Sequence, residues 1–253
     1  MSDGKIYVVG IGPGKPEKMT REAFDTLESC DIIVGYTVYI DLLRPSFPQK
    51  EFASTPMRQE IERCKMCFDF ALAGKKVAMV CSGDAGVYGM AAPIFELQEK
   101  SPSYENVEIV VIPGVTAANN GAAVLGAPLN HDYCIISLSD LLTPWETIEK
   151  RLKAAVAGDF AVALYNPASH KRHDYLRRAC EVMISAGANA QTPCGYAQNI
   201  GREDEKTVIC TLSELMNADV NMFTTVFIGN SQTQVCAGSV NGKRLVTKRG
   251  YEI

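Results

Sequence analysis

A glycine-rich turn with the sequence GIGPGKP, residues 10–16, follows the first apolar run of the chain. A dinucleotide-binding turn would carry its third glycine where Lys15 stands. The phosphate loop of an NTPase would continue after that lysine with Ser or Thr, where this chain has Pro16. Pro13 also removes a backbone amide that a phosphate group would use. The turn therefore predicts close backbone approach to a partner that is not a pyrophosphate.

Two further small-residue segments follow apolar runs in the first half of the chain. The segment SGDAGVYGM at 82–90 contains a single carboxylate, Asp84. A carboxylate at the end of a parallel strand can hold a ribose or an ammonium group, and a plain turn is the alternative. The segment PGVTAAN at 113–119 would present helix-start amides to a ligand, although tight helix packing explains its alanines equally well.

The second half of the chain carries ALYNPAS at 163–169 and QNIGRE at 198–203, again at the ends of predicted strands. A basic run between them, HKRHDYLRR at 170–178, contains four Lys or Arg and two His. Such a run is most often the solvated face of a helix. His170 and His173 have no acidic or thiol partner placed by the sequence, so we predict no metal site.

The nine cysteines are an odd number in a chain without a secretory signal, which argues against a disulfide scaffold. Most lie in apolar runs and are interpreted as small core hydrophobes. Cys64 and Cys67 have the spacing of a zinc pair, but no second pair follows at zinc-site distance. We therefore predict a structural role for both.

The elements that would position these loops alternate along the chain between short β-branched runs and helical patterns. This alternation is typical of an α/β fold with mainly parallel sheets. The predicted strands are residues 5–9, 31–35, 76–81, 107–112, 133–138, 160–165, 193–198, 207–210 and 224–228.

Three helices have clear signals at their ends. Thr143 is predicted to cap a helix that has Pro144 in its first turn and ends at Gly158. A helix over 57–73 would bury the face formed by Ile61, Cys64, Phe68 and Leu72. A third helix is predicted over 171–186, ending at Gly187.

A turn-rich stretch at 126–132 predicts a boundary between two α/β domains, residues 1–126 and 127–253. A chain of 253 residues is long enough for two coupled domains. We expect them to face each other across a cleft, because ligands bind in such clefts and at the carboxyl ends of parallel strands.

The charge balance excludes some classes of partner. The formal net charge is −4, and residues 1–126 hold 12 basic and 16 acidic side chains, against 13 of each in the remainder. Neither half has the basic excess of a nucleic-acid-binding domain. No apolar stretch approaches the roughly 18 residues of a membrane span, and the N-terminus turns polar too early for a signal peptide. We expect a cytoplasmic protein that binds neither nucleic acid nor membrane.

Taken together, these loops resemble the tetrapyrrole methylase family, the S-adenosylmethionine-dependent methyltransferases of corrin and sirohaem synthesis. The similar segments cover nearly the whole chain in order and include TTVFIGNS at 224–231. With VGYTVYIDL at 34–42, they are most similar to the members that methylate C(17) of precorrin-3B or cobalt-precorrin-3, with ring contraction to the precorrin-4 stage. Tyr36 stands where the sirohaem branch has an aspartate. Pro56 replaces a glycine usual in the ring-contracting group.

The resemblance implies a two-domain fold, usually a homodimer, with S-adenosylmethionine in the inter-domain cleft. Gly12 and Gly14 would line the tetrapyrrole side of that cleft. Carried over residue by residue, the cofactor contacts would be Pro13, Ser82, Gly83, Asp84, Val87, Thr116 and Ala117 from the first half, and Asn166 and Thr225 from the second.

Methyl transfer from a sulfonium requires alignment and exclusion of water more than a strong nucleophile. Ring contraction also requires proton transfers, for which the candidate acids and bases are Asp84, Tyr36, Tyr39 and His131, with Asn166 as a hydrogen-bond donor. The carboxylates of the substrate require cations. The candidates are Arg58, Arg63, Lys171, Arg172 and Arg202, and we expect the electropositive rim to depend mainly on residues 171–178.

Two other functions remain open. The same fold and cofactor would serve methylation at C(11) of precorrin-4 or C(20) of precorrin-2. A protein of another class, a nucleotide-binding module, would contact phosphates through the GIGPGK turn.

Overall fold

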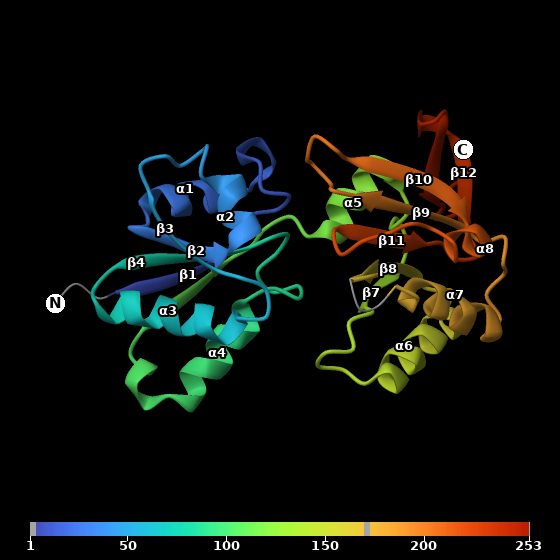
Figure 1. Ribbon diagram of the computed structural model, residues 1–253. Coiled ribbons are helices and arrows are strands. Elements are labelled where there is room, and N and C mark those ends of the chain that lie inside the picture. The colour runs from blue at the N-terminus through green and yellow to red at the C-terminus, as the bar shows by residue number, and fades with distance from the viewer. Residues whose placement is uncertain (1–3, 170–172, 253) are drawn as a thin grey trace. The chain divides into compact units, whose positions relative to one another are not determined.

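The computed structural model describes residues 4–169 and 173–252, and it divides into two compact units, Met1–Ala117 and Ala118–Ile253 (Figure 1). The division falls earlier than the expected boundary after residue 126. The helix α5 (Ala117–Leu125) accounts for this difference, because it packs on the second unit. A Cβ atom added at Gly121 would lie 2.7 Å from the ring of Phe227.

The first unit contains a five-stranded sheet in the order β3-β2-β4-β1-β5, and every neighbouring pair is parallel. Strands β1, β2 and β4 read as nearly continuous apolar runs, which is typical of parallel strands covered on both faces. Helices α1 and α2 cover one face and α3 and α4 the other (Figure 1). The strands are β1 (Lys5–Gly10), β2 (Ile32–Tyr36), β3 (Glu51–Thr55), β4 (Lys76–Cys81) and β5 (Glu108–Ile112). The predicted list lacked β3.

The helices of the first unit are α1 (Arg21–Ser29), α2 (Thr37–Leu43), α3 (Glu60–Leu72) and α4 (Ala91–Lys100), with short 3-10 turns at Pro16–Lys18 and Pro102–Tyr104. The buried face of α3 is rotated from the predicted one. Cys64 and Phe68 are buried as expected, whereas Ile61 is 49% and Leu72 56% exposed. Arg63 and Cys67 are buried instead, since the stripe that faces the sheet follows positions 63, 64, 67, 68 and 71.

The main sheet of the second unit has the order β10-β9-β11-β8-β7. Only its β7–β8 pair is parallel, so the prediction of mainly parallel sheets is correct for the first unit and wrong for the second. A short loop joins β9 to β10, and such connections give antiparallel pairs. The strands are β7 (Tyr133–Ser137), β8 (Ala161–Tyr165), β9 (Pro193–Gln198), β10 (Lys206–Thr211) and β11 (Thr224–Ile228).

A second, three-stranded sheet has the order β12-β13-β6, with strands β6 (Gly126–Ala127), β12 (Thr233–Val240) and β13 (Lys243–Thr247). None of these three strands was predicted. The remaining helices are α6 (Trp145–Ala157), α7 (Tyr175–Ser185) and α8 (Leu212–Leu215). Helix α6 begins after Pro144, which occupies the cap position, so the predicted Thr143 cap is wrong. The start predicted for α7 lies partly at residues 170–172, outside the described residues.

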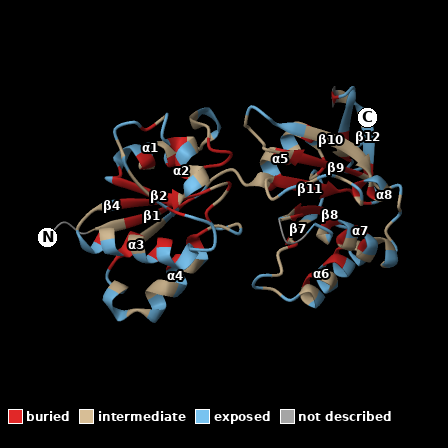
Figure 2. Cartoon of the chain, in the orientation of Figure 1, coloured by how far each residue is buried: buried red, intermediate tan, exposed pale blue. Residues whose placement is uncertain are grey.

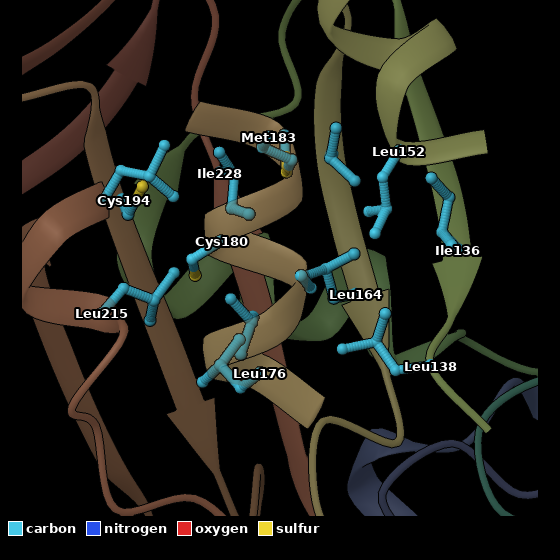
Figure 3. Packing of buried hydrophobic residues seen from close by; sticks show 14 of the residues in the cluster. Ile136, Leu138, Leu152, Leu164, Leu176, Cys180, Met183, Cys194, Leu215 and Ile228 are labelled. Atoms are coloured by element: carbon cyan, nitrogen blue, oxygen red, sulfur yellow. The ribbon is translucent and has the colours of Figure 1, made fainter. Parts of the chain in front are cut away.

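Each unit has its own apolar core, seen as buried strands beneath helices that are exposed on their outer faces (Figure 2). In the second unit, Leu152 of α6 and Leu176 and Met183 of α7 pack towards Leu164 and Ile228 of the sheet (Figure 3). On the opposite face, Leu125 of α5 joins a smaller cluster with Phe227. The loops at the strand ends contribute to these cores in part, since Ile11, Ala85 and Met90 are buried members of the first unit's clusters.

The cysteines are free thiols, and all but Cys236 belong to these cores or pack against them. Cys64 and Cys67 pack among apolar residues of the first unit, which agrees with a structural role. Among the described residues, no group of three or more His, Cys, Asp or Glu is arranged to hold a metal ion. No helix within those residues is long and apolar enough to cross a membrane.

Candidate cofactor and substrate site

Three of the glycine-rich segments meet at one edge of the first sheet. Strands β4, β1 and β5 are parallel neighbours, so their carboxyl ends lie side by side, and the segments 10–16, 82–90 and 113–119 follow those ends. Gly12 and Gly83 form an isolated bridge in which each amide donates to the carbonyl of the other, at 3.0 and 2.8 Å. The loops after β1 and β4 are thereby joined.

Glycine is required where these backbones touch. A Cβ atom at Gly114 would lie 2.1 Å from the carbonyl oxygen of Gly83 and 2.5 Å from that of Gly10. A Cβ atom at Gly10 would lie 2.7 Å from the amide nitrogen of Gly114. The close approach predicted for the first loop is therefore made to the two neighbouring loops. Gly12 and Gly14, with φ of 56° and 98°, are buried together with Pro13.

Asp84 fastens this arrangement through its carboxylate. Its Oδ1 accepts hydrogen bonds from the amides of Gly86 at 2.8 Å and Val87 at 3.2 Å, and its Oδ2 accepts from the amide of Gly114 at 2.9 Å. These three bonds leave about one acceptor position free, on Oδ2, since a carboxylate has about four. Asp84 can therefore receive one further donor, and its main contribution is to hold the loops after β4 and β5 together.

The remaining first-unit residues predicted to contact the cofactor lie on the same loops. The Ser82 hydroxyl donates to the carbonyl of Gly12 at 3.3 Å, and Val87 and Thr116 are half-buried. Gly86 is exposed, and a Cβ atom there would meet only the Asp84 carboxylate, at 3.4 Å. A ligand beside Gly86 would thus meet open backbone, which fits a small molecule held by backbone groups.

The candidate acids and bases lie on separate segments of the chain. Tyr36 ends β2 at the same sheet edge as the glycine-rich loops, and its ring lies edge-on to Tyr39 with centroids 5.2 Å apart. His131 is exposed just before β7, and its Nδ1 accepts from the amide of Asp132 at 2.8 Å. It therefore lies at the amino end of β7, whereas Asn166 follows the carboxyl end of the parallel neighbour β8.

The second sheet gathers its own motif residues at one edge. Because β11 runs antiparallel to β8 and β9, its first residues lie beside the ends of those strands, with Thr225 opposite Ala197. Asn166 has φ of 54°, and its Nδ2 donates to the Ser137 hydroxyl at 3.0 Å. Thr225 is only 4% exposed. The Tyr165 hydroxyl, which the sequence did not single out, accepts from the amide of Ala118 at 2.7 Å in the first turn of α5.

The candidate cations differ sharply in exposure. Arg58 is exposed, and Arg202 is half-buried with its guanidinium 4.7 Å from the centre of the Phe223 ring. Arg63 is 4% exposed, so it cannot serve as a surface cation and the expectation that it binds a substrate carboxylate is wrong. Lys171 and Arg172 lie outside the described residues.

Two other cations of the predicted rim have partners within the second unit. Arg177 donates to the side-chain oxygen of Asn217 at 2.8 Å, and the Arg178 guanidinium stands 4.1 Å from the centre of the Trp145 ring. Two of the cations expected to form the electropositive rim over 171–178 therefore make contacts within the second unit.

Comparison with known proteins agrees with the arrangement of the loops. The family profile of the Tetrapyrrole (Corrin/Porphyrin) Methylases matches residues 5–216. A probable cobalt-factor III C(17)-methyltransferase of Salmonella typhimurium is 44% identical over 248 residues, which is 98% of this chain and 100% of that protein. A precorrin-3B C(17)-methyltransferase of a Sinorhizobium species is 39% identical over 249 residues, covering 98% and 97%.

Solved structures show the same relationship. The methyltransferase CobJ has a TM-score of 0.87 and 33% identity, covering 97% of this chain and 100% of that one. A uroporphyrin-III C-methyltransferase from Thermus thermophilus, solved with S-adenosyl homocysteine, shares the fold with a TM-score of 0.71 at 18% identity. With its motifs at the strand ends and its similarity spanning both units, the chain belongs to the tetrapyrrole methylase family of methyltransferases.

Proposed function

We propose that this chain transfers a methyl group from S-adenosylmethionine to C(17) of precorrin-3B or of its cobalt-containing counterpart, with ring contraction, in cobalamin biosynthesis. The observation that carries this proposal is the identity of 44% and 39% to two C(17)-methyltransferases over nearly their full lengths. The joined glycine-rich loops at the edge of the first sheet support it, because they offer backbone groups to a small ligand.

The cofactor supplies an electrophilic methyl group on a sulfonium, so the protein needs to hold and orient it and to exclude water. Ser82, Gly83, Asp84 and Val87 lie on one loop of the first unit with open backbone at Gly86. Asp84 would accept one hydroxyl or ammonium donor on Oδ2 while keeping its three amide bonds. Pro13, Thr116, Ala117, Asn166 and Thr225 stay predicted cofactor contacts.

The substrate's carboxylates would be met by cations at the strand ends. Arg58, exposed in the turn after β3, and Arg202, half-buried in the loop after β9, are the candidates for this role. Lys171, Arg172, Gly12 and Gly14 stay predictions. For proton transfer, Tyr36 is a better candidate than His131, because Tyr36 lies at the sheet edge that carries the glycine-rich loops. The hydrogen bonds of Asp84 to three amides favour a positioning role for this residue.

The experiment is incubation of the purified protein with S-adenosylmethionine and either precorrin-3B or cobalt-factor III, with product identification by mass spectrometry and NMR. We expect one added methyl group at C(17) and a contracted ring. A methyl group at C(11) or C(20) would assign the chain to another member activity. Calorimetry showing no binding of S-adenosyl homocysteine at millimolar concentration would overturn the whole proposal.

We also propose a homodimer located in the cytoplasm. Light scattering of the purified protein checks the first point, since the mass of one chain is 27.5 kDa. Fractionation of cells that express the chain checks the second.

A further inference from the structure

Arg63 is a buried cation without a partner of opposite charge among the described residues. It lies on α3 at 4% exposure, none of the ion pairs in that part of the chain includes it, and its Nε has no hydrogen-bond partner. Burial of an unpaired charge opposes folding. A charge kept under these conditions calls for a role that stability does not explain.

The thiols around Arg63 do not provide a counter-charge. Cys64, Cys67 and Cys81 are close enough for Arg63 to favour their thiolates. Burial has the larger effect, however, and raises the pKa of Cys64 to about 12 and that of Cys81 to about 11. These groups are therefore neutral at physiological pH, and the hydrogen-bond partners of the Arg63 guanidinium within the described residues are neutral dipoles.

Those dipoles belong to two segments at the loop edge of the first sheet. Arg63 Nη2 donates to the carbonyl oxygens of Pro56 at 3.2 Å and Thr55 at 3.5 Å, while Nη1 lies 3.8 Å from the sulfur of Met90. Thr55 and Pro56 begin the turn between β3 and α3. Met90 ends the loop 82–90, which carries Asp84. The guanidinium thus contacts both segments and connects them.

The turn over residues 55–59 is held in a specific and unusual shape. Arg58 has φ of 71°, a left-handed conformation that costs a non-glycine residue free energy and persists only where its surroundings enforce it. Its amide donates to the Glu60 carboxylate at 3.2 Å, and the Thr55 hydroxyl donates to the carbonyl of Gln59 at 3.4 Å. Arg63 contacts the start of this turn, and the Arg58 side chain is exposed on it.

We propose that Arg63 is a positioning residue that fixes the 55–59 turn against the loop 82–90, so that Arg58 meets a substrate carboxylate in one defined place. This inference rests on the proposed function for the identity of the substrate. It assigns to Arg63 an effect on tetrapyrrole affinity, exerted through the backbone of the turn.

The test compares Arg63→Met and Arg63→Lys with the control Lys65→Met, which makes the same kind of change at an exposed position of α3. Methionine has a similar length and flexibility without the charge, so we expect Arg63→Met to melt at or above the wild-type temperature. We expect its amides at 55–60 to exchange hydrogen about tenfold faster and its KM for the tetrapyrrole to rise about tenfold.

The effects on the two ligands, the tetrapyrrole and S-adenosyl homocysteine, distinguish a positioning role from a general loss of structure. Asp84 still fastens the cofactor loop in Arg63→Met, so we expect kcat and the Kd for S-adenosyl homocysteine to stay within about threefold of wild type. Arg63→Lys keeps the charge and a donor group, so its KM should lie between those of the wild type and Arg63→Met. The control should match the wild type throughout.

Parallel loss of melting temperature and of both ligand affinities would show a merely structural residue and overturn the proposal. Wild-type exchange and wild-type KM in Arg63→Met would overturn it as well. If the wild-type protein methylated neither tetrapyrrole, the proposed function would fail. Amide exchange, which needs no substrate, would still decide whether Arg63 holds the turn.

Discussion

At the scale of single residues, the site depends on polar side chains that fasten the backbone. Asp84 uses its carboxylate to bind three amides from two loops, and Asn166 uses its amide to reach Ser137 from a left-handed backbone position. Both residues were selected as cofactor contacts. The structure shows that each also holds the loop on which it lies.

The first prediction concerns Asp84→Asn. The amide group of asparagine has one acceptor oxygen and places an NH₂ group against an amide donor, so at least one of the three hydrogen bonds is lost. We expect unfolding to cost about 1–3 kcal/mol less and S-adenosyl homocysteine to bind more weakly. Urea denaturation and calorimetry measure the two effects. Asp69→Asn, at an exposed position of α3, is the control and should change neither.

The second prediction concerns Asn166, where backbone and side-chain roles can be separated. Asn166→Gly tolerates a φ of 54° and Asn166→Ala does not, so the glycine variant should be more stable by about 1 kcal/mol. Both variants lack the amide group. If that group contacts the cofactor, both should lose affinity for S-adenosyl homocysteine equally. Wild-type affinity in the glycine variant would show that Asn166 acts through the backbone alone.

At the scale of elements, the loops of the first unit form one assembly because their strands are parallel and adjacent. The ends of β4, β1 and β5 lie at one edge, and glycines at positions 10 and 114 allow their backbones to touch. In the second unit, the antiparallel direction of β11 brings Thr225 beside the ends of β8 and β9. Strand direction therefore decides which motifs become neighbours.

The third prediction compares two glycines of this assembly. In Gly114→Ala the new methyl group would lie 2.1 Å from the carbonyl oxygen of Gly83, so the loops must separate. We expect a loss of about 1–3 kcal/mol or more in the free energy of unfolding. Gly86→Ala has open space and should fold normally. Its affinity for S-adenosyl homocysteine should fall if the ligand lies over that backbone. Equal stability losses would contradict this account.

At the scale of the whole molecule, buried thiols are spread through both cores. Burial raises the pKa of Cys64 and Cys180 to about 12 from an ordinary value of 9.0. The unfolded chain releases these protons near pH 9, whereas the folded protein retains them. Between the two values the folded state binds more protons than the unfolded state, so stability is complete below pH 9 and declines as pH rises.

The fourth prediction is therefore that the urea midpoint falls progressively above pH 9. Cys180→Ala should show a shallower decline than the wild type, because one raised pKa has been removed from the folded state. Cys236→Ala, at a half-exposed position, is the matched control and should keep the wild-type slope. Identical slopes for wild type and Cys180→Ala would count against a contribution from this thiol.

Particular residues show how far sequence reasoning extends. Strands β4, β9 and β11 were predicted at their observed bounds, because buried strands form apolar runs that end at turn residues. The glycine-rich loops were correctly placed at strand ends for the same reason. β3 was missed, because its sequence, EFAST, contains no apolar run longer than two residues. The buried face of α3 was predicted wrongly, because Arg63 is buried whereas Ile61 is exposed.

The sequence by itself determined the α/β class, the positions of the loops and the family, because these depend on local patterning and on motif order. Only the tertiary structure decided that β11 runs antiparallel to β8, that α5 packs with the second unit, and that Asp84 accepts hydrogen bonds from three amides. Strand direction, packing partners and hydrogen-bond partners arise between residues far apart in the chain. Arg63 shows this most clearly, since only the fold reveals that it is buried and what it holds.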